Sequence, residues 1–559
     1  MAAATALAVF GEEPQSYNVK RTHKVVFQAL ADARALYGGS RPIIVDGDET
    51  VITYDNLIRA ALALGNALRK GTSVGEDVGI MLPSGAAAII AFFALSAFGR
   101  VPTMLNFSLG AKSVLSAMRT AKVKRIVTAH KFIELGKFDA LAEELSKRAE
   151  LVFLEDVKDR LSVFDKAVAA VGQFMPGFVT QGPTTPSLVT EIVTKVPAPH
   201  FVTNFIARKP AYEQPAVILF TSGTEGEPKG VALSHANILS NIEQARNHVA
   251  LYPHDTMFNP LPAFHCFGLI IGAILPLILG MKSVQHPTPL QPREISRRIR
   301  DTHATILLAT DTFMSQYARA GEPGNLKSLR LAVSGGERVR DETRQLLRRS
   351  NAIEILEGYG VTETSPVLAV NQPGANHPGT VGHILPGMQA RLEPVEGIPN
   401  AGRLFVKGPN VMLGYIRPQN PGVIVPPPGG WHDTGDIVHI DPEGYISIRG
   451  RMKRFAKIGG EAVSLAVVEN CASALWPDFS HAAIALPDGR KGEHIVLLTT
   501  NPEADRIDLI GWAQNHGVPE IAVPKRIIHV DAIPVLGTGK IDYTQVEKMA
   551  RTEKPAVLS

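Results

Sequence analysis

Short apolar runs rich in β-branched residues alternate with helical patterns from about residue 40 onward, and this alternation constrains the fold most strongly. The runs cover residues 41–45, 78–82, 125–128, 150–154, 216–221, 304–308 and 329–334. Between two of them, residues 54–70 carry a helical pattern. The alternation predicts parallel sheets covered by helices. At 559 residues the chain is too long for one hydrophobic core, so we expect more than one folding unit.

The longest uncharged stretch, residues 78–99, has the length of a membrane-spanning helix. Pro83, Ser84 and Gly85 interrupt it, which favours a strand, a turn and a helix buried in an α/β core. The apolar start of the chain has no basic region before it, which is atypical of a signal peptide. We therefore expect no membrane-spanning segment.

Charge and cysteine content exclude several classes of function. The formal net charge of +4, from 57 Lys and Arg and 53 Asp and Glu, is too small to indicate a nucleic-acid-binding surface. The two cysteines, Cys266 and Cys471, form no C-x-x-C motif. They exclude a disulfide framework and a four-thiolate zinc site, and they fit a reducing compartment.

The sequence AVILFTSGTEGEPKG, residues 216–230, joins an apolar strand to a loop rich in glycine and hydroxyl side chains. Glycines let the backbone approach a ligand closely, and Lys229 adds a positive charge, which together suit a polyphosphate. The loop is no Walker A motif, because its lysine precedes the last glycine. From these residues alone, a phosphate-binding loop and a flexible surface turn are both consistent interpretations.

This loop resembles the phosphate loop of the adenylate-forming superfamily, which includes acyl-CoA synthetases, peptide-synthetase adenylation domains and luciferases. Six further segments resemble motifs of that superfamily in its order: LPAFHCFG (261–268), SGGERV (334–339), EGYGVTET (357–364), WHDTGD (431–436), GRMKRFAKIGGE (450–461) and PVLGTGKID (534–542). The sequence departs from the pattern at Glu225, where Thr or Ser is usual, and at Glu337-Arg338, where Ala-Pro is usual.

The resemblance implies an α/β fold in two parts. A large N-terminal adenylation domain of helix-flanked sheets would span residues 1–452. A small, mobile α+β C-terminal domain would span residues 453–559, with Lys453 at the hinge position. Residues 171–215 and 423–433 carry many prolines and glycines, and we expect both to be loops.

The resemblance also implies that ATP and Mg²⁺ bind to the N-terminal domain. The residues for the β- and γ-phosphates would be Thr221, Ser222, Gly223, Thr224 and Lys229. Thr362 would bond the α-phosphate, and Glu363 would hold Mg²⁺, a cation that prefers oxygen ligands. Taken singly, Glu363 could instead be a solvated glutamate at a helix start.

The superfamily's adenosine contacts fall on the remaining motifs. Tyr359 would stack on adenine, beside the loop that contains Gly336, Glu337 and Arg338. Asp436 would accept both ribose hydroxyls, and Arg451 would reach the same sugar. The structural alternatives are a core tyrosine for Tyr359 and a turn aspartate for Asp436.

The implied reaction has two halves. A carboxylate attacks the α-phosphorus of ATP to form acyl-AMP and pyrophosphate, and a thiol then displaces AMP. Lys540 would offset the charge of the first step. His265 could gate the acyl pocket or be a core histidine. Rotation at Lys453 would withdraw Lys540 and bring Gly459 and Gly460 to the thiol channel.

A finer resemblance is to the synthetase half of bacterial bifunctional acyltransferase/acyl–acyl-carrier-protein synthetases, in segments such as NHPGTVGHILPG (376–387) and HGVPEIAVPKRI (516–527). It implies transfer of a fatty, long-chain acyl group to acyl carrier protein, with CoA as the alternative acceptor. No acyltransferase motif starts the chain, so we expect a stand-alone synthetase or a fragment of a longer protein.

Residues 449–460 contain five basic side chains and no acidic one, which would steer an acidic carrier protein or merely form a solvated turn. A P-loop kinase or ATPase and a catalytically silent lipid-binding protein are competing hypotheses. The glycine spacing argues against the first, and the presence of Lys540, Glu363 and Asp436 argues against the second. We expect a cytoplasmic location, and a fatty substrate would favour peripheral association with the inner face of the membrane.

Overall fold

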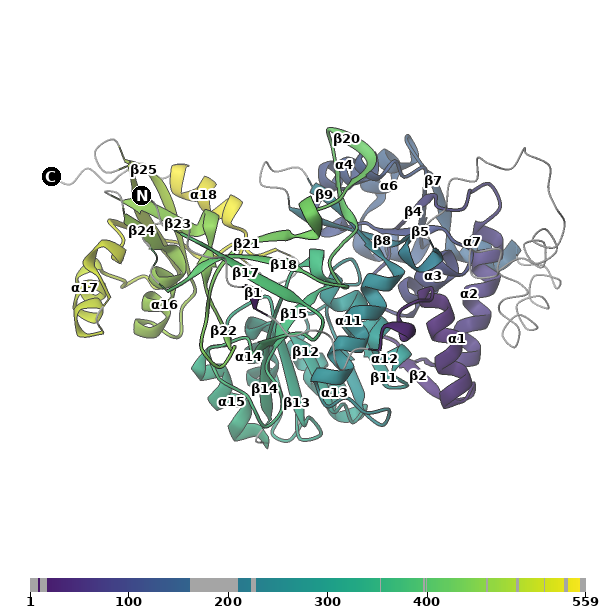
Figure 1. Cartoon of the computed structure of the whole chain (residues 1–559), viewed down its shortest axis with the longest axis horizontal. Coiled ribbons are helices and arrows are strands. Elements are labelled where there is room, and N and C mark those ends of the chain that lie inside the picture. The colour runs from purple at the N-terminus through teal and green to yellow at the C-terminus, as the bar shows by residue number, and fades with distance from the viewer. Residues whose placement is uncertain are drawn as a thin grey trace.

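The structure is a computed structural model of the chain. It describes residues 9–10, 18–160, 210–222, 228–351, 353–395, 398, 400–458, 461–488, 492–516, 518–536 and 541–552. Figure 1 shows a larger body of sheets and helices and, at the C-terminal end of the chain, a smaller body. The loop predicted over residues 171–215 lies outside the described residues up to residue 209.

One sheet has nine strands in the order β16-β15-β14-β13-β12-β10-β11-β2-β3. Their bounds are β2 (Pro42–Val45), β3 (Val51–Thr53), β10 (Thr256–Asn259), β11 (Lys282–Gln285), β12 (Ile306–Ala309), β13 (Leu331–Gly335), β14 (Glu354–Gly360), β15 (Val367–Val370) and β16 (His383–Ile384). The strands from β14 to β2 run parallel, as the sequence predicted. Their carboxyl ends therefore share one edge of the sheet, which is where ligands bind in such folds.

A second sheet has eight strands in the order β20-β19-β9-β8-β5-β4-β6-β7. Their bounds are β4 (Asp77–Ile80), β5 (Val101–Met104), β6 (Arg125–Thr128), β7 (Glu150–Phe153), β8 (Pro215–Ser222), β9 (Pro228–Ser234), β19 (Gly414–Arg417) and β20 (Asn420–Val425). The strands from β7 to β8 are parallel, whereas β9, β19 and β20 extend the sheet in antiparallel pairs.

The largest hydrophobic core joins the two sheets and includes Ile44 of β2 and Ile80 of β4. Helices α1 (Val26–Tyr37), α2 (Tyr54–Leu68), α3 (Ala86–Ala97) and α11 (His235–His248) contribute many of its other residues. At Gly65 of α2, a β-carbon would overlap the Phe98 ring and the Ala94 carbonyl, so glycine is needed for the close approach of α3.

The uncharged stretch at residues 78–99 folds as predicted, into β4, a turn and α3. Helix α3 is buried over nearly its whole circumference, which explains its almost entirely apolar sequence. Across the described stretches of the chain, no helix is both long and apolar enough to span a bilayer.

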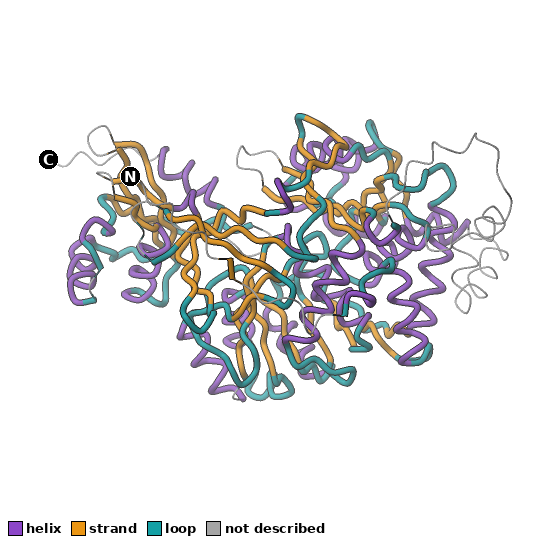
Figure 2. The backbone as a smooth tube through the Cα atoms, in the orientation of Figure 1, coloured by secondary structure: helices purple, strands orange, loops and turns teal. Residues whose placement is uncertain are grey.

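A third sheet is antiparallel and has the order β1-β17-β18-β21-β22. Its strands are β1 (Val9–Phe10), β17 (Gln389–Pro394), β18 (Gly402–Lys407), β21 (His432–Ile440) and β22 (Ile446–Arg451). The prediction of a loop over residues 423–433 was wrong at both ends, because β20 extends to Val425 and β21 begins at His432. In Figure 2, long strands lie between the C-terminal body and most of the helices.

The smaller C-terminal body has its own sheet, with the order β24-β23-β26-β25 and β27 beside β26. Its elements are β23 (Phe455–Ile458), β24 (Glu461–Ser464), α16 (Leu465–Leu475), β25 (His481–Asp488), β26 (Gly492–Thr499), α17 (Arg506–Asn515), β27 (Arg526–His529) and α18 (Tyr543–Thr552). Two hydrophobic clusters separate from the main core fill it. The short 3-10 helix η7 (Met452–Arg454) joins β22 to β23, and the predicted boundary after residue 452 falls within it. The fold is therefore α/β, with a large N-terminal and a smaller C-terminal domain.

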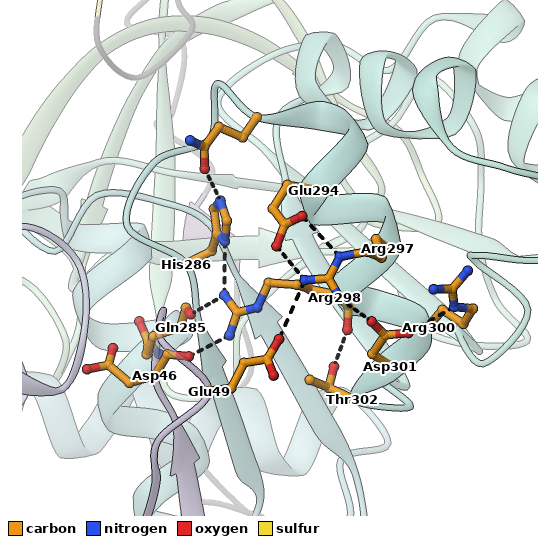
Figure 3. Close-up of polar contacts among 11 residues, drawn as sticks. Asp46, Glu49, Gln285, His286, Glu294, Arg297, Arg298, Arg300, Asp301 and Thr302 are labelled. Atoms are coloured by element: carbon orange, nitrogen blue, oxygen red, sulfur yellow. Dashed lines mark hydrogen bonds and ion pairs between the residues drawn. The ribbon is translucent and has the colours of Figure 1, made fainter.

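A buried arginine fixes the carboxyl ends of β2 and β11 (Figure 3). Arg298, on α13 (Pro292–Asp301), is almost completely buried. Its Nη1 donates to the carbonyl of Gln285 at 2.9 Å and to Nδ1 of His286 at 2.9 Å. Its Nη2 donates to the carbonyl of Asp46 at 2.5 Å. Three acceptors, at the end of β11 and just beyond the ends of β2 and β11, are thus tied to one side chain.

Candidate active site

The phosphate-loop strands place Thr221 and Lys229 side by side. Thr221 of β8 pairs directly with Lys229 of β9, so both side chains lie on the same face of the eight-stranded sheet. The Thr221 hydroxyl is buried and has no hydrogen-bond partner among the described residues. Such an orphaned donor is uncommon in a folded protein and suits a ligand oxygen. Ser222 ends β8, and Gly223 and Thr224 lie outside the described residues.

Glu363 lies across from this pair. Thr362 and Glu363 begin the 3-10 helix η5 (Thr362–Thr364), directly after β14 of the nine-stranded sheet. Lys229 Nζ lies 3.6 Å from Glu363 Oε1, and the Tyr415 hydroxyl donates to the same oxygen at 2.5 Å. Burial lowers the pKa of Lys229, and the Glu363 carboxylate opposes that effect. The predicted phosphate lysine and the predicted Mg²⁺ carboxylate therefore meet in one site.

The predicted adenosine residues bond to one another. The hydroxyl of Tyr359, near the end of β14, donates to Asp436 Oδ2 at 2.5 Å. Arg451 Nε lies 2.9 Å from Asp436 Oδ1, because Asp436 on β21 and Arg451 on β22 are directly paired. The Asp436 side chain is 3% exposed and that of Arg451 is 63% exposed, so the arginine closes the site from the solvent side.

These groups share one electrostatic environment. Burial raises the pKa of Tyr359, and the Asp436 carboxylate raises it further. Burial also raises the pKa of Asp436, against the lowering effect of Arg451. The Glu363 carboxylate contributes to the raised pKa of both Asp436 and Arg451, which places it near them.

The predicted adenine-edge loop follows β13 at the same edge of the sheet. Gly336 has a φ of 86°, a left-handed conformation that favours glycine. Glu337 accepts a hydrogen bond from the Thr312 backbone at 3.1 Å and so caps α14 (Asp311–Ala320), whereas Arg338 is exposed. The departure from Ala-Pro thus supplies a helix cap and a solvent-facing cation.

His265 lies at the start of a wide helical turn, and its side chain is half-buried. The next residue, Cys266, is buried with Sγ 4.0 Å from the Thr362 carbonyl, so this segment adjoins η5. The π-helix η4 (Phe267–Ile274) follows, and a β-carbon at Gly335 would lie 3.2 Å from the Phe267 ring. π-Helical turns are frequent at functional sites. The predicted acyl-pocket segment therefore lies between the Thr362 and Gly336 loops.

The predicted hinge and lysine-loop residues are only partly described. Lys453 is exposed on η7, and its charge contributes to the lowered pKa of Lys229. Gly459, Gly460 and Lys540 lie outside the described residues. Tyr543, which follows Lys540 by three positions, has a pKa that burial raises, and to which the Glu337 carboxylate also contributes. This places Tyr543 of the C-terminal domain near the adenine-edge loop.

Arg454, one of the five basic residues of segment 449–460, makes its contacts within the C-terminal domain. Its guanidinium donates to the Ala483 carbonyl at 2.7 Å and to Glu469 at 2.7 Å, and it stacks 3.6 Å from the Tyr543 ring centre. Its side chain is only 17% exposed. Arg454 is therefore held inside the C-terminal domain and contributes little to an exposed basic face. The remaining basic side chains of this segment, on Arg449, Arg451, Lys453 and Lys457, are exposed.

The arrangement of these site residues suits a nucleoside triphosphate. A cation and an orphaned hydroxyl lie on the phosphate side, and a carboxylate with further acceptor capacity lies on the sugar side. In the parts of the chain that the structure describes, no group of three or more His, Cys, Asp or Glu residues could hold a metal ion. Glu363 could still bind Mg²⁺ together with substrate phosphates, which is how this ion commonly binds.

Comparisons with known proteins agree with this geometry. The family described as "AMP-binding enzyme" matches residues 30–416, more than half of the chain. The chain belongs to this family.

The AMP-binding enzymes that the chain resembles include full-length relatives. The long-chain-fatty-acid–CoA ligase of Salmonella typhimurium is 25% identical over 554 residues, covering 96% of this chain and 96% of the relative. The medium-chain fatty-acid–CoA ligase of Escherichia coli K12 is 25% identical and covers 90% and 87%. The ATP-bound structure of MatB from Rhodopseudomonas palustris shares the fold, with a TM-score of 0.75, 24% identity and coverage of 94% and 99%. The chain is an AMP-forming acid–thiol ligase.

Two residues of this AMP-binding enzyme's site were not found from the sequence. Tyr415 reaches Glu363 from β19, and the pairing of β19 with β9 joins segments far apart in the chain. Glu357, two positions before Tyr359, accepts from the backbones of Val339 at 3.1 Å and Gly379 at 2.9 Å. Its place inside EGYGVTET was the one available signal, because a glutamate in a buried strand needs partners.

Proposed function

We propose that the chain activates a long-chain fatty acid with MgATP, forming acyl-AMP and pyrophosphate, and then transfers the acyl group to a thiol. The observation that carries the proposal is the meeting of two halves of one site. The Tyr359–Asp436–Arg451 group suits adenosine, and the Thr221–Lys229–Glu363 group suits a triphosphate with its cation.

The sugar side would bind ribose through Asp436. Tyr359 and Arg451 each use one carboxylate oxygen, and each oxygen keeps a further lone pair for a ribose hydroxyl. Arg451 also favours the ionised form of the buried carboxylate, because its charge lowers the pKa of Asp436 against the effect of burial. Gly336 and its neighbours would approach the adenine edge.

On the phosphate side, Lys229 and the Thr221 hydroxyl would bind the β- and γ-phosphates, with Ser222, Gly223 and Thr224 completing the loop. Thr362 would bond the α-phosphate. Glu363 would hold Mg²⁺, which neutralises phosphate charge when bound. Lys540 would stabilise the charge that develops as the fatty carboxylate attacks the α-phosphorus.

The second half-reaction would follow rotation of the C-terminal domain about Lys453, which brings the Gly459-Gly460 segment to the acyl-AMP. A thiolate then attacks the acyl carbon and AMP leaves. We propose CoA as the acceptor, because the two full-length relatives named above are fatty acid–CoA ligases. Acyl carrier protein is the second candidate, favoured by the exposed Arg449, Lys453 and Lys457 in a segment without acidic residues. A cytoplasmic location with peripheral membrane association stays a prediction.

One assay tests the proposal. Radiolabelled fatty acids of graded chain length are incubated with MgATP, and CoA and holo-acyl carrier protein are offered side by side. We expect pyrophosphate and AMP as products, with one acceptor consumed much faster. Release of ADP, or no acyl-AMP with any chain length, would contradict the proposal. Faster use of the carrier protein would reverse the choice of acceptor.

A further inference from the structure

Tyr415 lies at the centre of the phosphate side of the site, although no sequence motif assigned it a role. On the antiparallel pair β9–β19, Tyr415 lies opposite Val231, so Lys229 is its diagonal neighbour on the same face. Lys229 Nζ lies 3.8 Å from the centre of the Tyr415 ring, a cation–π contact. The ring therefore supports the lysine from one side.

The hydroxyl group of Tyr415 contacts the Glu363 carboxylate, which is also near Lys229. It donates to Glu363 Oε1 at 2.5 Å, and Lys229 Nζ lies 3.6 Å from the same oxygen. The Glu363 carbonyl accepts from the Met412 backbone at 2.8 Å, which fastens η5 to the segment that leads into β19. Among the residues that the structure describes, both side-chain contacts use Oε1, so Oε2 is left for another ligand.

We propose that Tyr415 is a positioning residue that holds Glu363 ready for a magnesium ion and keeps Lys229 available for phosphate. The inference rests on the proposed function, in which Glu363 binds the ion and Lys229 the phosphates. The hydroxyl gives Glu363 a neutral hydrogen-bond donor, and this hydrogen bond does not have to break when the nucleotide binds.

The direction of the effect follows from competition between charges. Without the hydroxyl, the buried Glu363 has Lys229 as its remaining side-chain partner among the described residues. A direct ion pair between the two would tighten, because a buried carboxylate without a donor is costly. The ion and the phosphates would then each have to break that pair. Removal of the hydroxyl therefore weakens the benefit that Mg²⁺ gives to ATP binding.

The experiment measures ATP affinity by titration calorimetry, with Mg²⁺ and with EDTA. In the wild-type protein we expect Mg²⁺ to increase the affinity. In Tyr415→Phe, which keeps the ring, the ratio of the two affinities should fall about tenfold, the effect of one hydrogen bond to a charged group. In Glu363→Gln the ratio should be low already, and adding Tyr415→Phe should change it less than about twofold.

Tyr54→Phe is the matched control, because it also removes a tyrosine hydroxyl that donates a 2.5 Å hydrogen bond. The acceptor of this buried hydroxyl is the backbone carbonyl of Leu277. The control substitution should leave the ratio unchanged. A wild-type ratio in Tyr415→Phe, or independent effects of Tyr415→Phe and Glu363→Gln, would overturn the inference and leave the proposed function standing. A wild-type protein that binds ATP under neither condition would contradict the proposed function itself.

Discussion

The Asp436 carboxylate contacts both Tyr359 and Arg451. The ribose-binding role proposed for it can be tested by replacing one carboxylate oxygen with an amide nitrogen. Asp436→Asn keeps the shape and one oxygen but loses a charged acceptor, so ATP affinity should fall by about 10- to 100-fold. The wild-type protein should bind 2′-deoxy-ATP more weakly than ATP, and the variant should discriminate less between them. Asp433→Asn, in the same WHDTGD motif, is the control, because Asp433 pairs with Arg403 instead. Equal discrimination in wild type and Asp436→Asn would exclude the ribose role.

His286 predicts how stability depends on pH. Burial, together with the charge of Arg298, lowers its pKa from 6.5 to about 4. Between these values the unfolded chain binds a proton that the folded protein does not, so the free energy of unfolding falls as pH decreases from 6.5 to 4. The loss from this group is at most ~3 kcal/mol. Urea titrations at several pH values should show a shallower dependence in His286→Gln than in the wild type or in the exposed control His254→Gln. An unchanged slope would contradict the assignment.

At the scale of elements, Arg298 is expected to stabilise the edge of the nine-stranded sheet. Arg298→Met takes the guanidinium donor away from the carbonyls of Asp46 and Gln285, although the Asp46 carbonyl still accepts from the Glu49 backbone at 3.0 Å. The substitution also removes the cost of burying a charge. We expect a net loss of ~2 kcal/mol in the free energy of unfolding. Its neighbour Arg297 makes only surface ion pairs and is 41% exposed, so Arg297→Met should change stability by less than ~1 kcal/mol (Figure 3). Equal effects of the two substitutions in urea titrations would show that the buried contacts contribute nothing.

Some strands of the molecule could be predicted from the sequence and others could not. The parallel strands, such as β2, β12 and β13, appear as continuous apolar runs because both faces of their sheet are covered. The antiparallel strand β20 escaped prediction because it is mostly exposed, so its sequence resembles a loop. Motif residues such as Asp436 were found because their neighbours in the chain mark them. Tyr415 was missed, and the contacts that hold Arg454 inside the C-terminal domain were not foreseen, because non-local pairing determines the partners of both residues.

At the scale of the whole molecule, the two domains meet where η7 leaves β22, so the hinge segment is continuous with the ribose side of the site. Arg454, which follows the proposed hinge residue, donates to Glu469, and Glu469 also accepts from the Tyr543 hydroxyl at 3.0 Å. The start of α18 is thereby fastened to α16 and η7.

Lys540 provides the decisive whole-molecule test, because its proposed role belongs to only one arrangement of the domains. Lys540→Ala should abolish fatty-acid-dependent exchange of pyrophosphate into ATP, since no cation would then offset the charge of the first step. The variant should still convert supplied acyl-AMP to the thioester, because that step needs the opposite arrangement. Lys548→Ala, an exposed lysine on α18, is the matched control and should retain both activities. Normal exchange in Lys540→Ala would refute the role, and loss of both half-reactions would point to a structural defect in the C-terminal domain.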